Sequence, residues 1–238
     1  MPRGVSTEPN ATGRSITSMK PILITCGPSY EPIDKARRLT NFSTGRLGAL
    51  LADSLADGGW PVWCLRGEGA THPAPTKAQR VLPFGTNDDL LQLLVRAAAE
   101  SEFTAVLHAA ALCDYRVARI EDTSGTSLQG AKIPTRMGDL TLSLSPATKV
   151  LPKLRTLFPN SRIVGWKYEL EGGREEALAR ARRQITEARV DACVLNGDAY
   201  GPGFGFCASD GSLTPCADPL ELARLLNSWL LVFPSHLG

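Results

Sequence analysis

The sequence lacks a large charge of one sign and lacks any long hydrophobic run. Its 26 lysines and arginines nearly balance its 24 aspartates and glutamates, so the formal net charge is +2 at pH 7. This balance argues against a nucleic-acid groove or a membrane surface as the partner, since both favour a marked basic excess. No apolar run approaches the roughly 20 residues of a membrane-spanning helix. A local basic pocket for a phosphorylated metabolite stays compatible with this composition.

Closely paired cysteines are also missing. The chain has six cysteines, and no two of them have the two-residue spacing of zinc or redox motifs. Three of them, Cys26, Cys64 and Cys193, lie within apolar runs, and we interpret them as small buried hydrophobic residues. This use of cysteine is typical of a reducing compartment, so we expect a cytoplasmic protein.

The start of the chain lacks the features of a signal peptide, because no apolar stretch follows its few charges. Residues 1–19 are rich in Ser, Thr, Gly, Pro and Asn, and this composition predicts a disordered tail. Met19 would serve as well as Met1 as the first residue. Residues 20–238 are long enough to bury one sizeable core, so we expect them to form a single domain.

From Pro21 onward, apolar strand-like segments alternate with helical patterns. This alternation predicts an α/β fold of the Rossmann-like, doubly wound kind, with a mostly parallel sheet and helices on both faces. The expected strands are 21–26, 61–66, 81–82, 105–110, 140–144, 162–168 and 191–196, followed by a hairpin at 204–208 and 213–216. The expected helices are 44–57, 86–100, 149–158, 174–188 and 220–231.

The alternation breaks between residues 116 and 139, which are polar and rich in Gly, Ser and Thr. A long insertion without regular structure inside a compact domain is commonly a functional lid. We therefore expect a structureless flap here, with Lys132 as its candidate functional residue. A lysine on a mobile lid can clamp phosphoryl charge, although a lone surface lysine usually has no function.

The segment from Arg38 to Gly48 (RLTNFSTGRLG) follows the first strand and leads into a helix. In a parallel sheet, ligands bind beyond the carboxyl ends of the strands. Free N–H groups and the helix dipole around Ser43, Gly45 and Gly48 would attract a phosphate, and Arg46 could add a charge-assisted contact. The spacing matches neither the Rossmann nor the Walker glycine motif. A helix that is simply capped after a long turn is the alternative.

Other candidate residues stand in loops or at strand ends, and each has a structural alternative. Asn41 can polarise a carbonyl group or bond to its own turn. Asp114 can accept a hydrogen bond from a ligand or cap the exit from a strand. We interpret His108, inside an apolar strand, as a core histidine rather than a general base.

The later strands carry three further candidates. Trp166 can stack on a base or pack in the core, and Lys167 can reach the same pocket. Asn196 closes the last parallel strand, where a buried amide needs a partner from either a ligand or a loop.

These segments, in this order, resemble the phosphopantothenoylcysteine synthetase family from Pro21 to about Trp229. The family's Asn-x-Ser-(Ser/Thr)-Gly-x-x-Gly motif is intact here, and its other motifs appear in related form. In chain order, the matching segments are Gly27-Pro28-Ser29-Tyr30-Glu31-Pro32-Ile33-Asp34, Asn41 to Gly48, Ala110-Ala111-Leu112-Cys113-Asp114-Tyr115, Lys132-Ile133 and Asn196.

The resemblance implies a stand-alone ligase of coenzyme A biosynthesis that joins 4′-phosphopantothenate to cysteine through an acyl-nucleotidylate. It implies ATP or CTP as co-substrate, Mg²⁺ and a homodimer. It implies catalytic roles for Asn41 and Lys132. Substrate contacts are implied for Ser43, Gly45, Gly48, Ala110, Ala111, Trp166 and Asn196, and nucleotide contacts for Gly27, Asp114, Lys132 and Lys167.

Departures from the family pattern bear on the nucleotide and on turnover. Pro28 replaces the second glycine of the first motif and removes a backbone donor. Gln184 and Ala188 stand where fusion enzymes that use CTP have two lysines, whereas Trp166–Glu169 (WKYE) resembles the Phe-Lys-Leu-Glu of stand-alone enzymes that use ATP. ATP is therefore favoured. Because the sequence has no upstream decarboxylase segment, we expect no flavin.

Two other interpretations remain open at this point. A nicotinamide-dependent reductase on a similar sheet would need a glycine-rich turn after the first strand and an acidic residue ending the second, where this chain has Arg66. A non-catalytic protein that binds phosphopantothenate or a nucleotide would tolerate Pro28 and the altered helix. Assays of turnover and of NADPH binding separate the three.

Overall fold

The computed structural model describes residues 19–232. The tail expected at the N-terminus, apart from Met19, lies outside these described residues, as do residues 233–238. Within them, one eight-stranded sheet forms the centre of the protein, in the order β12-β11-β10-β9-β6-β1-β4-β5. Its strands are β1 (Ile22–Cys26), β4 (Val62–Gly67), β5 (Arg80–Phe84), β6 (Ala105–His108), β9 (Arg162–Tyr168), β10 (Ala192–Asn196), β11 (Phe204–Ala208) and β12 (Leu213–Cys216).

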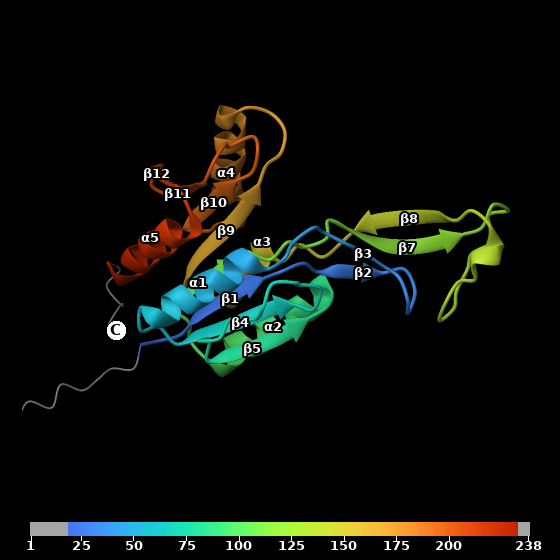
Figure 1. Cartoon of the computed structure of the whole chain (residues 1–238), viewed down its shortest axis with the longest axis horizontal. Helices are drawn as coiled ribbons and strands as arrows, with labels where there is room; N and C mark the ends of the chain where they lie inside the picture. Colours follow the sequence, from blue (N-terminus) through green and yellow to red (C-terminus); the bar gives the residue numbers. More distant parts are fainter. Residues whose placement is uncertain (1–18, 233–238) are drawn as a thin grey trace, which may run out of the picture.

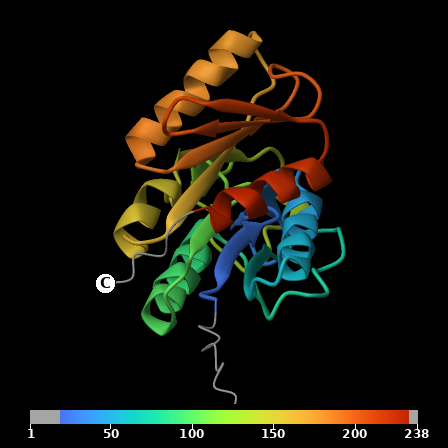
Figure 2. The same cartoon turned by 90° about the vertical axis from the view of Figure 1, so that its left-hand side faces the viewer.

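The sheet is parallel except at one edge, where β11 pairs antiparallel with β10 and β12. Helices α1 (Arg46–Asp57) and α5 (Pro219–Leu231) pack together on one face, over one cluster of buried residues. Helices α2 (Asn87–Glu100), α3 (Leu151–Leu157) and α4 (Arg174–Ala188) cover the other face and a second cluster (Figure 2). The doubly wound α/β arrangement expected from the sequence is confirmed.

Local capping explains why two of these helices begin where they do. The Thr86 hydroxyl accepts from the Asp89 N–H at 3.1 Å, and the Asp89 carboxylate accepts from the Thr86 N–H at 2.9 Å. This capping box satisfies two N–H groups that would otherwise lack partners at the start of α2. At α5, the Asp218 carboxylate accepts from the N–H groups of Leu220 and Glu221. Both caps were expected from the sequence.

The structure corrects the expected flap. Residues 116–139 are not structureless, because β7 (Tyr115–Glu121) pairs antiparallel with β8 (Thr141–Pro146). We call residues 115–146, the two strands and their connection, the arm. It extends away from the sheet (Figure 1). The strand was missed because its buried positions are few: only Ile120 in β7 is buried, so the apolar alternation is weak.

Smaller differences concern the ends of elements. The expected loop 27–43 contains a short hairpin, β2 (Tyr30–Pro32) and β3 (Arg38–Thr40). Helices α1 and α3 each begin two residues later than expected, and β6 ends at His108 rather than at residue 110. The 3-10 helix η1 (Thr135–Met137) lies in the arm. Among residues 19–232, no helix is long and apolar enough to cross a membrane.

Candidate functional site

The carboxyl ends of β1 and β6 lie side by side in the middle of the sheet. From β1 the chain continues to β4 and β5 on one side, whereas β6 leads to β9 and β10 on the other. The connections after these two strands therefore diverge, which opens the crevice where sheets of this kind bind ligands. Thr25 and His108 are register partners at this point, and their Oγ1 and Nδ1 atoms are 2.8 Å apart.

A pocket of about 370 Å³ opens beside this crevice, on the face covered by α2, α3 and α4. Its deep wall is neutral: Asn87, His108, Val150 and Ala188 are at most 6% exposed. Its rim is charged and wet, and carries the side chains of Lys149, Lys167, Arg180 and Arg183. The carboxylates of Asp114 and Glu187 also line the pocket, so its lining has two more cations than anions. A neutral floor with a net positive rim suits a ligand with one uncharged end and one anionic end.

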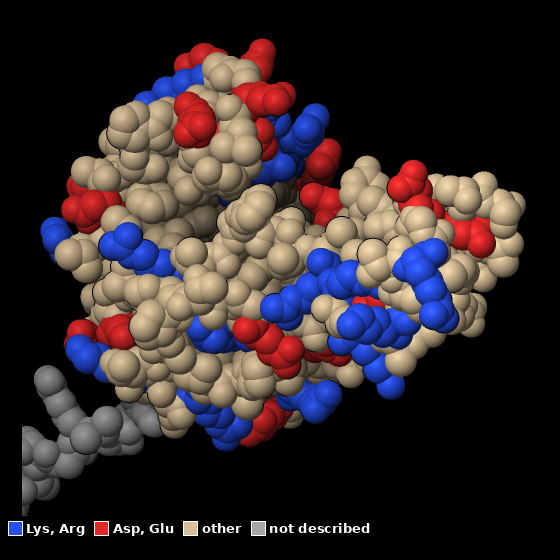
Figure 3. Space-filling model, turned by 45° about the vertical axis from the view of Figure 1, so that its right-hand side comes forward, with Lys and Arg blue, Asp and Glu red and all other residues tan. Residues whose placement is uncertain are grey.

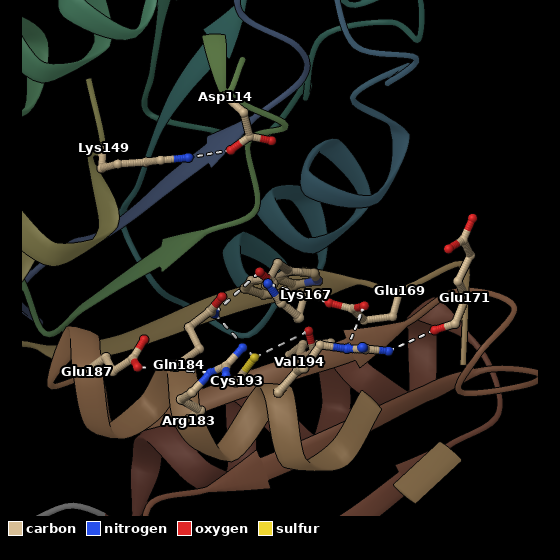
Figure 4. A network of polar contacts seen from close by, with 12 residues as sticks. Asp114, Lys149, Lys167, Glu169, Glu171, Arg183, Gln184, Glu187, Cys193 and Val194 are labelled. Atoms are coloured by element: carbon tan, nitrogen blue, oxygen red, sulfur yellow. Dashed lines mark hydrogen bonds and ion pairs between the residues drawn. The ribbon is translucent and has the colours of Figure 1, made fainter. Parts of the chain in front are cut away.

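Each rim cation has a carboxylate partner, and the partners come from opposite walls (Figure 4). Lys149 of one wall pairs with Asp114, while Arg183 of the other pairs with Glu187 at 3.9 Å. Because solvent reaches these pairs, each contributes little stability. A phosphate group could therefore replace the carboxylates at small cost. The two remaining pairs share Glu169, which lies 3.5 Å from Lys167 and 2.9 Å from Arg180.

His108 is neutral in the folded protein, since burial lowers its pKa from 6.5 to about 4. Thr25 is fully buried, and its hydroxyl oxygen accepts from the Ala110 N–H at 3.3 Å. The hydroxyl hydrogen then needs an acceptor, and among the described residues only Nδ1 of His108 is within reach. Thr25 therefore fixes the tautomer with the hydrogen on Nε2.

The low pKa of His108 predicts a loss of stability in mild acid. Below pH 6.5 the unfolded chain takes up a proton on this residue, but the folded chain does so only near pH 4. The free energy of unfolding should therefore fall between these two values, by up to about 3 kcal/mol from this group. Urea titrations of the wild type and of His108→Gln at pH 7 and pH 4.5 measure it. A variant with the same pH dependence as the wild type would contradict the assignment.

The start of α1 has unused backbone donors. Gly45 is the N-cap residue, and no side chain caps the helix in the usual way. The Arg46 N–H has only a 3.3 Å contact to the Thr44 hydroxyl. Among residues 19–232, the N–H groups of Leu47 and Gly48 have no partner. The amides expected to receive a phosphate are therefore available, but the 41–48 segment does not line the pocket described above.

The glycines in and around this segment are required by packing. A Cβ on Gly48 would lie 2.2 Å from the Cβ of Cys26, and one on Gly45 would lie 2.9 Å from the Cβ of Ala70. Gly27 meets Ala70 at the same 2.9 Å, and Gly27 and Gly45 both have positive φ. Close approach between backbone segments explains these three glycines without any ligand.

Asn41 joins the glycine segment to the strand-end segment that carries Asp114. Its Nδ2 donates to the Leu112 carbonyl at 2.9 Å, so the side chain neither bonds its own turn nor stands free. Ser43 is half-buried, and its N–H donates to the Asn41 carbonyl. Ala110 and Ala111 are half-buried beside β1, where the Ala111 N–H donates to the Gly27 carbonyl.

The three later candidates lie in different surroundings. Trp166 reaches the pocket wall but packs against the buried cluster under α1 and α5. Its indole N–H is buried and has no hydrogen-bond partner within residues 19–232. Lys167 belongs to the pocket rim. Asn196 ends β10 outside the pocket wall, and its carbonyl accepts from the Glu169 N–H.

Lys132 is not among the residues that line the pocket. It is exposed on the arm, between two residues that are tied to the β2–β3 hairpin. The Ala131 carbonyl accepts from the Lys35 N–H at 3.0 Å, and the Ile133 N–H donates to Asp34 at 3.1 Å. Arg37, paired with Asp34, also donates to the Ile133 carbonyl. The backbone around Lys132 is thus held in place, while its side chain remains free to meet a ligand.

Sequence reasoning missed three residues that the structure places in the pocket. Asn87 follows the expected helix cap Thr86 and was treated as part of the helix start. Lys149 lies before α3, and Arg183 lies on the exposed side of α4. Of these three residues, only Arg183 had a signal in the sequence, namely the basic composition of its helix. The positions of Asn87 and Lys149 in the pocket depend on tertiary contacts, since the chain returns to the sheet after the arm beside the start of α2.

Comparison with known proteins agrees with this fold. A model of the DNA/pantothenate metabolism flavoprotein C-terminal domain family matches residues 17–218. The chain belongs to this family. Among curated proteins, the coenzyme A biosynthesis bifunctional protein CoaBC of Thermococcus kodakarensis is 29% identical over 74% of the chain. The match spans 41% of that protein, and the chain likewise spans less than half of the other CoaBC relatives, 49% in the Vibrio vulnificus protein.

Solved structures share the fold of this family member. The DNA/pantothenate metabolism flavoprotein of Streptococcus pneumoniae superposes with a TM-score of 0.79 at 21% identity, over 89% of this chain and 98% of that one. A Cab2 variant in complex with phosphopantothenate-cysteine superposes with a TM-score of 0.67 at 18% identity, over 89% and 87%. At these identities the likeness establishes the fold.

Proposed function

We propose that this protein is a nucleotide-dependent ligase that joins 4′-phosphopantothenate to cysteine in coenzyme A biosynthesis. The observation that carries the proposal is the pocket at the divergence of β1 and β6, with its neutral floor and four rim cations. Family membership agrees with it, since relatives named for coenzyme A biosynthesis share this domain. The related Cab2 variant was solved with phosphopantothenate-cysteine.

In the proposed reaction, the phosphopantothenate carboxylate attacks the α-phosphate of the nucleotide and releases pyrophosphate. The cysteine amine then attacks the acyl-nucleotidylate and releases the nucleoside monophosphate. The rim cations, with Lys149 and Arg183 on opposite walls, would hold the triphosphate between them. The amides of Leu47 and Gly48 would take the phosphate of phosphopantothenate at the start of α1. Asn41, bonded to Leu112, would set the spacing between the two sites.

Magnesium would enter with the nucleotide. Residues 19–232 contain no cluster of three or more His, Cys, Asp or Glu side chains that could hold a metal ion. Mg²⁺ commonly binds through phosphate oxygens and water with few protein ligands, so a resident site is not needed. We keep ATP as the favoured nucleotide. We also propose a reducing compartment, since the six cysteines are free and buried.

We propose that the protein works as a homodimer in which the arm meets a second copy. The arm extends from the sheet as a two-stranded ribbon, and two-stranded ribbons are marginally stable on their own. It exposes apolar side chains, including Tyr115 at 56% and Leu144 at 48%. The molecular surface is hollowed beside the arm, and both basic and acidic side chains border the hollow (Figure 3).

The reductase alternative is weakened by Arg66. A cofactor 2′-phosphate would need this guanidinium, but Arg66 donates to the carbonyls of Ala70 at 2.7 Å and His72 at 2.5 Å. Both Nη2 hydrogens are therefore used by the carbonyls of the loop that follows β4, which turns part of the guanidinium away from a cofactor phosphate. A non-catalytic binding protein remains the competing candidate because of Pro28, which lies within the packed segment after β1.

One experiment tests the proposed function directly. The protein is incubated with phosphopantothenate, cysteine, Mg²⁺ and one nucleoside triphosphate at a time, and pyrophosphate release is measured. We expect release that requires all components, with ATP as the best nucleotide. Binding of phosphopantothenate without pyrophosphate would establish the non-catalytic alternative, and NADPH binding would favour the reductase.

Asn41→Asp should impair turnover with little effect on folding. The aspartate cannot donate to the Leu112 carbonyl, and two oxygens would then face each other across a 2.9 Å gap. We expect kcat to fall by about tenfold to a hundredfold, while the melting temperature changes little because Asn41 is exposed. Asn160→Asp is the control, because Asn160 is an exposed turn residue that does not line the pocket. Normal kinetics in Asn41→Asp would reject its role.

A further inference from the structure

The part of the arm that carries Lys132 is bonded to the rest of the protein in one place. Among residues 19–232, the connection formed by residues 129–139 makes three hydrogen bonds to other segments. All three end on the turn of the β2–β3 hairpin, at residues 34–37. Ile133 is also the one buried residue of this connection, with 5% of its surface exposed. The position of the backbone at Lys132 therefore depends on the hairpin turn.

The two oxygens of the Asp34 carboxylate have different partners. Oδ1 accepts from the N–H groups of Ala36 and Arg37, both at 2.8 Å, and so closes the turn. Oδ2 accepts from the Ile133 N–H at 3.1 Å and from the Arg37 side chain. None of the Asp34 side chain is exposed to solvent. One buried carboxylate therefore joins the hairpin to the arm.

Arg37 holds the same residue of the arm from its other side. Its Nη2 donates to the Ile133 carbonyl at 2.8 Å and also to Oδ2 of Asp34. The N–H and the C=O of Ile133 are thus both bonded to one ion pair, and bonds to charged groups are stronger than neutral ones. The Arg37 side chain, together with three backbone N–H groups, holds the pKa of Asp34 well below its usual value. The pair therefore stays charged at neutral pH.

We propose that the Asp34–Arg37 pair positions Lys132 for the reaction by holding the backbone of Ile133. This inference rests on the proposed function and on the catalytic role expected for Lys132. The lysine side chain is flexible, so a loose backbone would add to the entropy lost when its ammonium group meets a phosphate. Packing alone does not fix the connection, because a Cβ added at Gly130 would meet nothing within 4 Å. Asp34 and Arg37 are therefore positioning residues.

Asp34→Asn tests this role because it can keep the turn while releasing the arm. The amide oxygen can replace Oδ1 and accept the two N–H groups of the turn. The amide nitrogen then faces the Ile133 N–H and the Arg37 guanidinium, which are also donors. Asp122→Asn is the matched control in the same arm. The Oδ1 atom of Asp122 alone accepts the hydrogen bonds of its turn, so this amide can keep them.

Trypsin measures the contact directly, because it cuts after lysine, at the peptide bond whose N–H belongs to Ile133. Cleavage requires this N–H and the buried Ile133 side chain to come free. Cleavage after Lys132, identified by mass spectrometry, should be at least about tenfold faster in Asp34→Asn than in the wild type, since local opening limits the rate. Asp122→Asn should be cut there at the wild-type rate.

Pyrophosphate release then shows whether the pair acts through Lys132. Asp34→Asn should lower kcat by about tenfold or more when Lys132 is present, because the ammonium group is no longer held in place. In a protein that already carries Lys132→Gln, the same substitution should change kcat by less than about twofold. A residue that only supported the fold would lower kcat by the same factor in both backgrounds.

The outcomes separate this inference from the proposed function. Unchanged cleavage in Asp34→Asn, with normal turnover of the wild type, would overturn the positioning role and leave the ligase proposal intact. An equal loss of kcat in both backgrounds would overturn the action through Lys132. A wild type that releases no pyrophosphate would overturn both proposals.

Circular dichroism confirms that each variant is folded. If Asp34→Asn fails to fold, Arg37→Lys takes its place in the same two assays. The lysine keeps the positive charge beside Asp34 but lacks the fork that reaches Asp34 and Ile133 together. We expect faster cleavage after Lys132 and a lower kcat that depends on Lys132, and wild-type behaviour in both assays would overturn the inference.

Discussion

Replacing Lys132 with glutamine is expected to lower kcat by about a hundredfold or more, since removal of one charge-stabilising donor typically has this effect. The side chain is exposed and makes no hydrogen bond or ion pair among the described residues, so the protein should stay folded. Pyrophosphate release measures kcat, and thermal unfolding followed by circular dichroism measures stability. The combination of full stability and lost turnover would identify Lys132 as a residue that acts on the ligand.

The matched control is Lys35→Gln, an exposed lysine on the neighbouring hairpin whose backbone N–H donates to Ala131. This substitution removes one lysine charge from the segment that bonds to the residue before Lys132, and it keeps the backbone hydrogen bond between them. We expect near-normal turnover. If Lys132→Gln turns over normally, or if both variants lose activity equally, Lys132 has no specific role.

The arm raises the question of which pocket Lys132 serves, because it does not line the pocket of its own chain. Mixing Lys132→Gln with Asn41→Asp answers it. If the arm of one copy serves the pocket of the other, a random mixture regains about a quarter of wild-type activity, because half of the dimers have one intact composite site. If the arm serves its own pocket, or if the protein is a monomer, mixing restores nothing.

Replacing Gly48 with alanine is expected to destabilise the protein by about 3 kcal/mol or more, the upper range for overpacking a core. The added Cβ would lie 2.2 Å from the Cβ of Cys26, in the buried contact between α1 and β1. Neither atom sits at the end of a flexible side chain, so the helix itself must move. Urea unfolding at pH 7 measures the change.

Gly130→Ala is the control for this prediction. Gly130 has no neighbour within 4 Å of an added Cβ and does not have positive φ, so its substitution should leave stability nearly unchanged. An equally stable Gly48→Ala would mean that α1 can shift freely, and the packing explanation would fail. If that variant were stable but no longer bound phosphopantothenate, a direct contact with the ligand would explain the glycine instead.

Much of the fold could be predicted because its signals are local. The buried strands are short apolar runs, the helix α2 begins with the Thr86 and Asp89 capping pair, and α5 begins at Asp218. Alternation of strands and helices then allows few topologies. The family resemblance also rested on local motifs, chiefly Asn41 to Gly48, and the family model confirms it.

The candidate site was less predictable, because its contacts join distant parts of the chain. The Thr25–His108 bond spans 83 positions, and the Asn87–Thr148 bond spans 61. The interpretation of His108 as a core histidine agrees with its burial, but its place in the wall of a pocket has no local signal. The phosphate role of Gly48 stays a prediction, and its close contact with Cys26 is a second reason for glycine that the sequence does not reveal.

The sequence by itself determined the class of fold, the main helices and strands, and the motif order of the family, since each depends on neighbouring residues. Only the tertiary structure decided that residues 115–146 form a paired arm, that Asn87 and His108 share a pocket, and that Lys132 lies outside it. These features depend on which side chains meet once the sheet has formed. Such contacts join residues far apart in the chain, so they leave no periodic pattern in the sequence.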